Sequence, residues 1–477
     1  MMVSRERPSS GELTYDRGTL VVHAPQTCCP SPHFIWDART DSWRAPAWRY
    51  PTVTRVLSEA HGDRFNDRVL EVVDLQLVTK ELHTLREDQR EALTRWRGAD
   101  DRGLIVMPTG TGKTEIAMTA MTDCGTATLI VSPIRDLMYQ WHRRIQRAFG
   151  NDAGILGDGR HEIRPITVTT YDSAFIYMDQ IGNRFGLIVF DEVHHLAGRN
   201  LRQAAELCAA PRRLGLTATL ERTDGLHMAL MDLVGPVVYR QEVSEARGRT
   251  LAEYETIRIP VHLTPREQRH YNAAAATVRY FVMERRKTNP SYTWQDVCSE
   301  AARDPAARRA LRAFRFKATI EDRAEEKLRV LEDLFRLHAQ EPVLVFAGSN
   351  SMAVDISRRF LLPVLLHHSR KEERYWALDG FTNGRFRALV ANQVLDEGID
   401  VPAVKVAVVV GGLASTRQAK QRLGRILRKT GSARAVLYEI VCDETHEKER
   451  SRQRRQSDAY SGTRTMREHT LQYRVGR

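Results

Sequence analysis

The sequence lacks any apolar run of about 18 residues, the length that a membrane-spanning helix requires. Its first residues include Arg5, Glu6 and Arg7, and they contain no apolar segment of the kind found in secretory signal peptides. These absences argue against a membrane protein and against a secreted one. We therefore expect a protein that works in the cytoplasm without a membrane partner.

Cysteine is also scarce, with six residues in a chain of 477. Only Cys28 and Cys29 are close in sequence, and adjacent cysteines do not form the usual zinc-binding pair. We expect reduced thiols that mostly fill the cores of the domains.

Aromatic residues make up only 7% of the chain, yet residues 36–50, WDARTDSWRAPAWRY, concentrate them among arginines. Aromatic and arginine side chains together can stack on bases and hold phosphates. They can equally form the core of a small domain, which needs large side chains to fill its centre. Both interpretations stay open. The residues concerned are Trp36, Trp43, Trp48 and Tyr50, with Arg39, Arg44 and Arg49.

Residues 1–75 predict a separate small α+β domain. Residues 13–22 alternate around Arg17-Gly18 as a hairpin does, and a helix is expected from Tyr50 to Ala60. Residues 69–78 are strand-like and lead into the next domain.

Lysine and arginine outnumber aspartate and glutamate, and the formal net charge is +12. A balance of this sign favours nucleic acid or an anionic surface as partner, with plain solubility as the alternative explanation. Basic residues crowd into residues 245–321, where helices are expected at 273–286, 294–303 and 305–317. This segment predicts a helical insert that grips a phosphate backbone, or less specifically a solvated helix face.

Residues 76–244 and 322–445 alternate short apolar runs with helical segments. This pattern predicts two α/β domains, each with a parallel sheet covered on both faces. Residues 446–477 form a charged tail that we expect to fray. Strands are expected at 103–107, 127–132, 166–170, 186–191, 213–217 and 236–239, then at 343–346, 364–366, 388–390, 406–410 and 436–441.

A glycine-containing turn follows the first of these strands and precedes a helix, which is the geometry of a phosphate-binding loop. Gly110 and Gly112 let the backbone N–H groups point inward, and the helix start adds its unpaired N–H groups. Lys113 is expected to reach the β- and γ-phosphates of ATP, with the Thr114 hydroxyl on Mg²⁺. The complete loop is Met107, Pro108, Thr109, Gly110, Thr111, Gly112, Lys113 and Thr114.

Two carboxylates, Asp191 and Glu192, directly follow the apolar run 187–190. Asp191 is expected to hold Mg²⁺, and Glu192 to orient and deprotonate the attacking water. His194 is interpreted as a contact to the γ-phosphate or to a coupling element. Thr217-Ala218-Thr219 ends another strand, where small hydroxyls can relay the state of the nucleotide.

The second α/β domain has no phosphate loop, but it carries a row of arginines on an expected helix. Facing the first sheet, such a row can supply arginine fingers to the γ-phosphate. The segment 396–400 follows a strand and can join the same cleft. Arg86 and Gln89 precede the phosphate loop at the distance of an adenine-reading segment. The further candidates are Gln421, Arg422, Arg425 and Arg428, with Gly398 and Asp400.

Together these motifs resemble those of superfamily 2 helicases and translocases. The stretches LREDQREAL, MPTGTGKT, VSPIRDLMYQW, TTYDSAF, DEVHHL, LGLTATLERTDG, VLVFAGSN, NQVLDEGIDVP and QRLGRILR occur in the family's order. Within that superfamily the chain looks most like the XPB (xeroderma pigmentosum group B) DNA helicases in their compact archaeal and bacterial forms. In this superfamily the first glycine of the loop, here Met107, is commonly absent.

The resemblance implies two RecA-like domains flanking an ATP cleft, a small N-terminal damage-recognition domain and a thumb-like helical insert. It also implies single-stranded and forked or duplex DNA as partner, movement from 3′ to 5′, a role in DNA repair, and association with the nucleoid in a prokaryote. We expect a monomeric motor.

One departure concerns an Arg-Glu-Asp element of the family that is thought to help open the duplex. Here the matching residues are Arg222, Thr223 and Asp224. The missing carboxylate keeps a second hypothesis open, an ATP-gated clamp that marks DNA and recruits a nuclease while barely unwinding. A third hypothesis keeps the motor but directs it to RNA.

Overall fold

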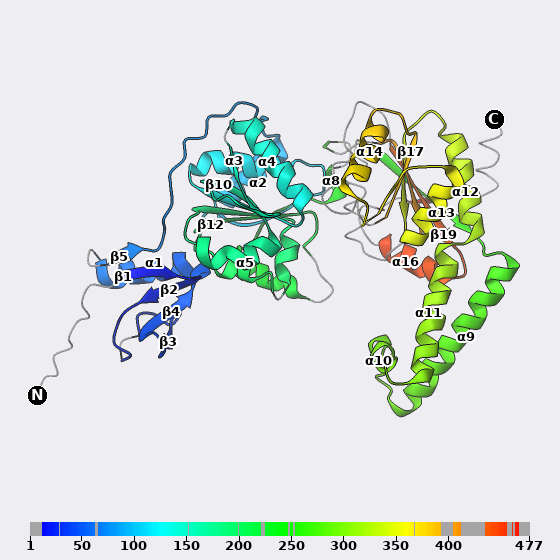
Figure 1. The fold of residues 1–477 in the computed structure, drawn as a ribbon, viewed down its shortest axis with the longest axis horizontal. Helices are drawn as coiled ribbons and strands as arrows, with labels where there is room; N and C mark the ends of the chain where they lie inside the picture. Colours follow the sequence, from blue (N-terminus) through cyan, green and yellow to red (C-terminus); the bar gives the residue numbers. More distant parts are fainter. Residues whose placement is uncertain are drawn as a thin grey trace, which may run out of the picture. The chain divides into compact units, whose positions relative to one another are not determined.

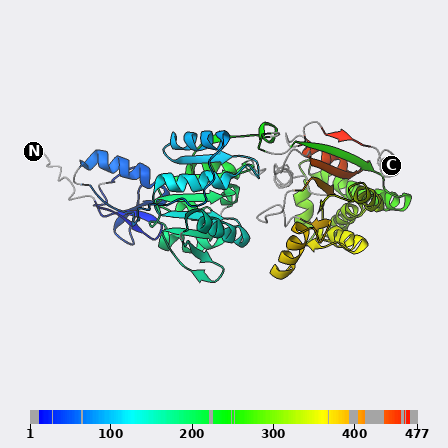
Figure 2. The same cartoon turned by 90° about the horizontal axis from the view of Figure 1, so that it is seen from above.

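The structure is a computed structural model that divides into two compact units, Met1–Glu242 and Val243–Arg477 (Figure 1, Figure 2). No helix in the part of the chain that it describes is both long enough and apolar enough to span a bilayer. The described residues are 12–27, 29–62, 65–150, 152–198, 200–220, 225–246, 249–250, 253–366, 368–392, 404–411, 435–455, 460 and 463–466.

A small sheet of five strands begins the first unit, in the order β3-β4-β2-β1-β5. The predicted hairpin is confirmed, because β1 and β2 pair antiparallel around Arg17 and Gly18, which both have positive φ. The predicted helix is also present as α1 (Tyr50–His61), and it buries Val53 and Leu57. The strands are β1 (Glu12–Asp16), β2 (Thr19–Val22), β3 (Ile35–Asp37), β4 (Ser42–Pro46) and β5 (Asn66–Arg68).

The small sheet is fastened to the larger part of the first unit by Tyr15. Its hydroxyl donates to the backbone oxygens of Met178 at 3.0 Å and Leu207 at 2.9 Å. At Gly18, a Cβ atom would lie 2.5 Å from Leu207 Cδ2, so only glycine fits there. The two parts of this unit are therefore in close contact.

The main sheet of the first unit has eight strands in the order β13-β6-β12-β11-β7-β10-β8-β9. All pairs are parallel except β8 with β9, so the carboxyl ends of the other strands meet along one edge. The six predicted strands are present. The strands are β6 (Arg102–Val106), β7 (Thr128–Ser132), β8 (Gly154–Gly157), β9 (Arg160–His161), β10 (Ile166–Thr170), β11 (Leu187–Asp191), β12 (Arg212–Thr217) and β13 (Val237–Arg240).

Both faces of this sheet are covered, as continuous apolar strands require. Along β6, Leu104 points into the core on one face and Ile105 into the core on the other. The Ile105 face packs against α2 (Glu87–Arg97), α3 (Lys113–Cys124) and α4 (Arg135–Phe149). The Leu104 face packs against α5 (Tyr171–Ile181) and α7 (Ala229–Leu233).

The strand-like segment at residues 69–78 is a wrong prediction. It forms only an isolated antiparallel bridge between Asp74 and Thr126. Polar residues at Glu71 and Asp74 interrupt its apolar pattern, and the segment runs as irregular chain beside the residues that lead into β7.

The second unit contains an all-parallel sheet of seven strands in the order β16-β17-β15-β18-β19-β14-β20. The five strands predicted here are present. The strands are β14 (Tyr254–Val261), β15 (Val343–Ala347), β16 (Val364–Leu365), β17 (Ala388–Ala391), β18 (Val406–Val410), β19 (Ala435–Cys442) and β20 (Arg464–Thr465).

The predicted start of the helical insert at residue 245 needs correction, because β14 precedes the insert and belongs to the sheet. It pairs with β19 in unbroken register from Tyr254 with Ala435 to Val261 with Cys442. Arg258 and other polar residues interrupt the apolar pattern of this strand, so the sequence did not predict it. In the structure Arg258 is ion-paired with Asp443. The insert proper consists of α9 (Pro265–Thr288), α10 (Trp294–Glu300) and α11 (Pro305–Asp322), and α12 (Glu325–Leu337) returns to the sheet.

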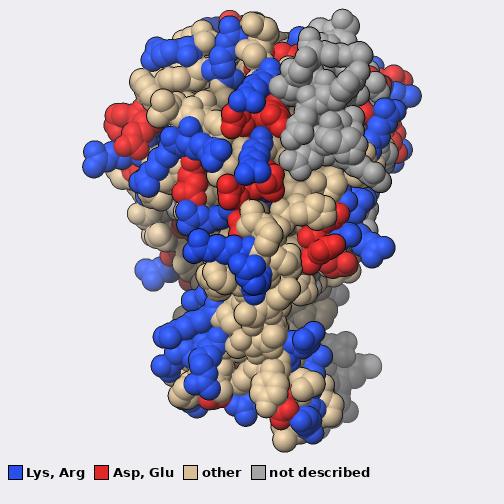
Figure 3. Space-filling model, turned by 90° about the vertical axis from the view of Figure 1, so that its right-hand side faces the viewer, with Lys and Arg blue, Asp and Glu red and all other residues tan. Residues whose placement is uncertain are grey.

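The helical insert projects from its sheet, and Figure 3 shows Lys and Arg side chains gathered over it at the lower part of the view. Arg285 on α9 forms ion pairs with Glu300 at the end of α10 and with Asp304 at the start of α11. Other arginines of the insert are exposed and form no ion pair in the described part of the chain, among them Arg279, Arg309, Arg312 and Arg315.

The expectation that a charged, frayed tail begins at residue 446 is wrong for its first part. Residues His446–Arg454 form helix α16, and β20 adds an edge to the sheet beside β14. Glu447 is fully buried with the ammonium of Lys327 at 2.7 Å. The local sequence suggests that Glu447 is exposed to solvent. Its charge is instead buried against Lys327, which lies 120 residues away in the sequence.

Candidate active site

The predicted phosphate loop joins the end of β6 to the start of α3, as its motif requires. Gly110 and Gly112 have φ values of 86° and 77°, which favour glycine. A Cβ atom at Gly112 would lie 2.5 Å from Nε2 of Gln89, so a side chain here would displace the Gln89 amide.

Lys113 is the first residue of α3, and its side chain is 9% exposed. Its ammonium donates to the loop carbonyls of Met107 at 2.9 Å and Pro108 at 3.3 Å. The Thr111 hydroxyl also donates to Pro108 O, at 2.7 Å. The Thr109 hydroxyl is buried without a hydrogen-bond partner among the described residues, so the loop keeps a polar group for a ligand.

Arg86 and Gln89 lie against the loop from the start of α2. Both donate to the Thr111 carbonyl, and Gln89 Nε2 also reaches Gly112 O at 3.2 Å. The Gln89 carbonyl accepts from Arg86 N at 3.0 Å. The amide of Gln89 is therefore held on both sides, and the pair braces the loop in this structure.

Asp191 ends β11, which is separated from β6 by β12 alone. Its Oδ2 accepts from the indole N–H of Trp141 at 2.8 Å, and its Oδ1 accepts from the backbone N–H of Glu192 at 3.0 Å. Removal from water, followed by the charge of Glu192, raises the pKa of Asp191 to about 6. The Trp141 hydrogen bond and the Lys113 charge oppose that rise.

Glu192 has a φ of 47°, a left-handed conformation that is uncommon for a residue other than glycine. This turn brings Glu192 Oε2 within 3.3 Å of the Thr217 hydroxyl and 3.4 Å of His194 Nδ1. His194 is buried, and its Nδ1 lies 3.0 Å from Thr217 Oγ1. The ends of β11 and β12 are thus joined by one cluster of side chains.

Sequence reasoning assigned no role to two side chains of this site, Trp141 and Tyr171. The Tyr171 hydroxyl donates to the backbone oxygen of Asp191 at 3.0 Å. Trp141 belongs to a helical apolar stripe with Met138 and Ile145, which indicates burial. A buried indole N–H needs a hydrogen-bond acceptor, so the sequence could have predicted that Trp141 has a polar partner.

The structure brings the phosphate loop, Arg86, Gln89, Asp191, Glu192 and His194 together at one edge of the sheet. No group of three or more His, Cys, Asp or Glu side chains able to hold a metal ion occurs in the described ranges. The remaining candidates lie outside the described residues: Gly398, Asp400, Gln421, Arg422, Arg425 and Arg428, and the Arg222-Thr223-Asp224 element.

The aromatic and arginine stretch of the small sheet contributes to the core of that sheet and also lines a hollow. Trp43 is 8% exposed and belongs to the core. Trp36 and Trp48 line a hollow of about 590 Å³ that also includes Glu206 and Leu207. Arg49 lies over the Trp48 ring, with 4.3 Å between the guanidinium carbon and the ring centroid.

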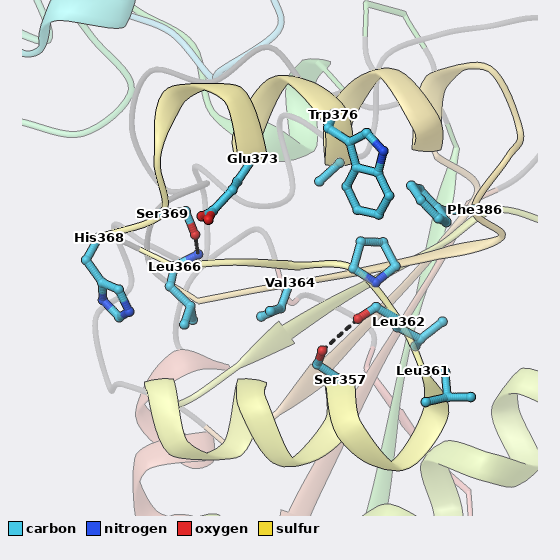
Figure 4. A pocket seen from close by; sticks show the side chains of 12 residues that line it. Ser357, Leu361, Leu362, Val364, Leu366, His368, Ser369, Glu373, Trp376 and Phe386 are labelled. Atoms are coloured by element: carbon cyan, nitrogen blue, oxygen red, sulfur yellow. Dashed lines mark hydrogen bonds between the residues drawn. The ribbon is translucent and has the colours of Figure 1, made fainter.

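A hollow of similar volume, about 590 Å³, lies in the second unit between α13 (Asn350–Phe360) and α14 (Lys371–Thr382) (Figure 4). Trp376 and Phe386 flank it on one side, and Ser357 donates to Leu362 O at 2.7 Å on the other. It contains none of the residues predicted to bind ATP.

Three family models match successive parts of the chain. They are the xeroderma pigmentosum group B helicase damage recognition domain at residues 13–69, the type III restriction enzyme res subunit at 82–222, and the helicase conserved C-terminal domain at 326–430.

Two solved structures share the fold at low sequence identity. The helicase domain of Hef from Pyrococcus furiosus has a TM-score of 0.52 and 18% identity, covering 78% of this chain and 100% of that one. Dbp5 from S. cerevisiae has a TM-score of 0.55 and 16% identity, covering 82% of this chain and 93% of that one. The fold, two RecA-like domains with a small N-terminal domain, and the matched helicase domains define a superfamily 2 helicase.

Curated relatives narrow the class. The DNA 3'-5' translocase XPB2 of Sulfurisphaera tokodaii is 38% identical over 427 residues, which cover 89% of this chain and 96% of that protein. The DNA 3'-5' helicase XPB of Mycobacterium tuberculosis is 30% identical over 394 residues, or 79% of this chain and 64% of that protein. The chain therefore belongs to the XPB family of ATP-dependent helicases.

Proposed function

We propose that this chain is a DNA-stimulated ATPase that moves from 3′ to 5′ along DNA, separates strands, and acts in DNA repair. The observation that carries the proposal is the convergence of Lys113, Asp191 and Glu192 at one sheet edge, in a chain that also matches a damage recognition domain. The names of the relatives supply the polarity.

The residues present fit a magnesium–ATP complex. The loop has a buried hydroxyl at Thr109 without a partner in the described part of the chain, a lysine at its end, and a carboxylate two strands away. Lys113 would bind the β- and γ-phosphates, and Thr114 with Asp191 would hold Mg²⁺. The ion, when bound, neutralises charge on the phosphate oxygens.

Glu192 is the residue that we assign to the attacking water, as its general base. Its contacts with Thr217 and His194 fix the carboxylate and connect it to the end of β12. This arrangement supports assignment to the DEVH-box subtype, with Asp191, Glu192, Val193 and His194 as the four named positions.

The second domain would complete the site. By resemblance Gln421, Arg425 and Arg428 supply charge to the γ-phosphate, and Gly398 and Asp400 join the same nucleotide cleft. Arg86 and Gln89 remain the predicted adenine-reading pair. Their contacts with Thr111 would then connect the base of the nucleotide to the loop.

DNA is proposed to contact the helical insert through those arginines that form no ion pair among the described residues. Arg309 and Arg312 lie three residues apart on α11, so they share one side of the helix. Contacts to phosphates carry no sequence code, and we therefore expect binding that tolerates any sequence and weakens with salt. Cytoplasmic location, nucleoid association and action as a monomer belong to the same proposal.

The clamp hypothesis remains the second candidate, because Thr223 stands where the family has a carboxylate. In that case a nuclease partner would cut the DNA that the chain marks. An RNA-directed motor is the third.

ATP turnover measured with no nucleic acid, single-stranded DNA, duplex DNA and RNA, beside a strand-displacement assay, tests the proposal. Stimulation by DNA with displacement supports the helicase. Turnover without displacement supports the clamp, and stronger stimulation by RNA overturns the choice of DNA.

A further inference from the structure

Trp141 and Asp191 come from different elements and meet through a hydrogen bond of 2.8 Å. Trp141 lies on α4, is 2% exposed, and packs in the core between that helix and the sheet. Its ring fills volume that phenylalanine could largely fill. Its N–H is different, because it is directed to one oxygen of a carboxylate at the candidate active site.

A carboxylate can rotate about its bond to Cβ, and a carboxylate that holds a metal ion must present its oxygens in a fixed direction. Here Oδ2 is held by Trp141 and Oδ1 by the backbone N–H of Glu192. Two donors from two sides fix the plane of the group. Each oxygen keeps a further acceptor direction, since a carboxylate oxygen has two lone pairs.

We propose that Trp141 is a positioning residue for Asp191, which orients the carboxylate for the metal that accompanies ATP. This inference rests on the proposed function and deepens it. The apolar ring anchors the N–H to the rigid face of α4, so the carboxylate stays aligned without an exposed partner that water could replace.

The matched control is Trp96, which lies in the same domain and is also fully buried. Its indole N–H donates at 3.0 Å to the backbone oxygen of Arg213, not to a carboxylate. Trp96→Phe therefore removes a buried indole hydrogen bond of the same kind while leaving Asp191 untouched.

The experiment measures the affinity of the full chain for a fluorescent ATP analogue, once with Mg²⁺ and once with EDTA. The ratio of the two affinities reports the metal's contribution. Trp141→Phe should reduce this ratio about tenfold, the scale of one hydrogen bond to a charged group, and leave the affinity in EDTA unchanged. Trp96→Phe should leave the ratio at the wild-type value.

The double variant Trp141→Phe/Asp191→Asn identifies the route of the effect. If Trp141 acts through Asp191, adding Trp141→Phe to Asp191→Asn changes the ratio no further. An unchanged ratio in Trp141→Phe, or an equal reduction in both backgrounds, overturns the positioning role. A wild-type chain without any gain from Mg²⁺ would instead overturn the proposed metal site itself. The EDTA affinity also checks that each variant is folded.

Discussion

Thr217 Oγ1 lies 3.0 Å from His194 Nδ1, so the end of β12 is linked by a hydrogen bond to the residues that follow β11. Through the same hydroxyl, Thr217 reaches Glu192 Oε2 at 3.3 Å. A side chain outside the phosphate loop thus contacts both the assigned base and the histidine beside it.

Replacing Thr217 by valine should separate ATP turnover from work on DNA. Valine keeps the shape but loses the hydroxyl. The phosphate loop and Asp191 stay in place, Glu192 keeps its contact with His194, and the link from Glu192 to β12 is lost. We expect turnover within about fivefold of wild type and strand displacement per ATP at least about tenfold lower. Parallel ATPase and displacement assays measure both.

Thr169→Val is the matched control for that variant. Thr169 is the last residue but one of β10 in the same sheet, and its buried hydroxyl donates to Leu156 O at 2.8 Å, away from the site. Equal losses in turnover and displacement for Thr217→Val, or the same behaviour in the control, would contradict the coupling role.

Lys113→Ala should abolish ATP turnover and preserve most DNA binding. The ammonium belongs to the loop, whereas the DNA contacts proposed above lie on the helical insert. Turnover and the anisotropy of labelled DNA should be measured on one preparation. Turnover at the wild-type rate would remove the basis for assigning the phosphate loop.

Glu192→Gln should bind ATP but hydrolyse it at least about a hundredfold more slowly, within the range for loss of a general base. Glutamine keeps the size of the side chain and can occupy the same backbone conformation. Single-turnover hydrolysis, beside nucleotide affinity, distinguishes loss of chemistry from loss of binding. A normal single-turnover rate would assign the base to another residue.

Arg312→Gln should weaken DNA binding by a similar factor for every sequence. It should also lower the slope of the logarithm of the binding constant against the logarithm of the salt concentration by about one. The arginine is exposed on α11 and forms no ion pair in the part of the chain described. Arg329→Gln on α12 is the control, because Arg329 is already paired with Glu326 at 2.7 Å. Titrations at several salt concentrations give the slope, and equal slopes for both variants would exclude α11 from the interface.

Lys327→Met should destabilise the second unit by about 3–5 kcal/mol, since Glu447 would stay buried without its cation. Adding Glu447→Gln should recover a large part, because the amide can be buried neutral. Amide hydrogen exchange of the full chain measures local opening at α12 and β19, and the sheet of the first unit serves as an internal reference. No gain from the second substitution would contradict this account.

The sequence was sufficient for the features that local chemistry determines. A glycine turn ending in Lys113 after an apolar strand has one common geometry, and Asp191 follows a run too apolar for anything but a buried strand. Parallel strands bring their carboxyl ends to one edge, which is why the loop and the carboxylates could be placed together in advance.

Features that depend on distant partners could not be predicted in this way. Arg258 interrupts the apolar pattern of β14, and only Asp443, far along the chain, makes its burial possible. Glu447 needs Lys327 in the same way. Trp141 could be assigned to the core, but its acceptor depends on where α4 lies relative to β11.

The helical insert leaves the second sheet after β14 and returns to it through α12, so both of its ends are attached to the same sheet. α9 alone has 24 residues and is about 36 Å long. On a helix of that length, a tilt of the base by about 10° would move the tip through about 6 Å. That displacement approaches the length of two nucleotides, about 3.4 Å each along a strand. If the insert contacts DNA as proposed, a small rotation at the sheet would be enough to advance that contact by a whole nucleotide.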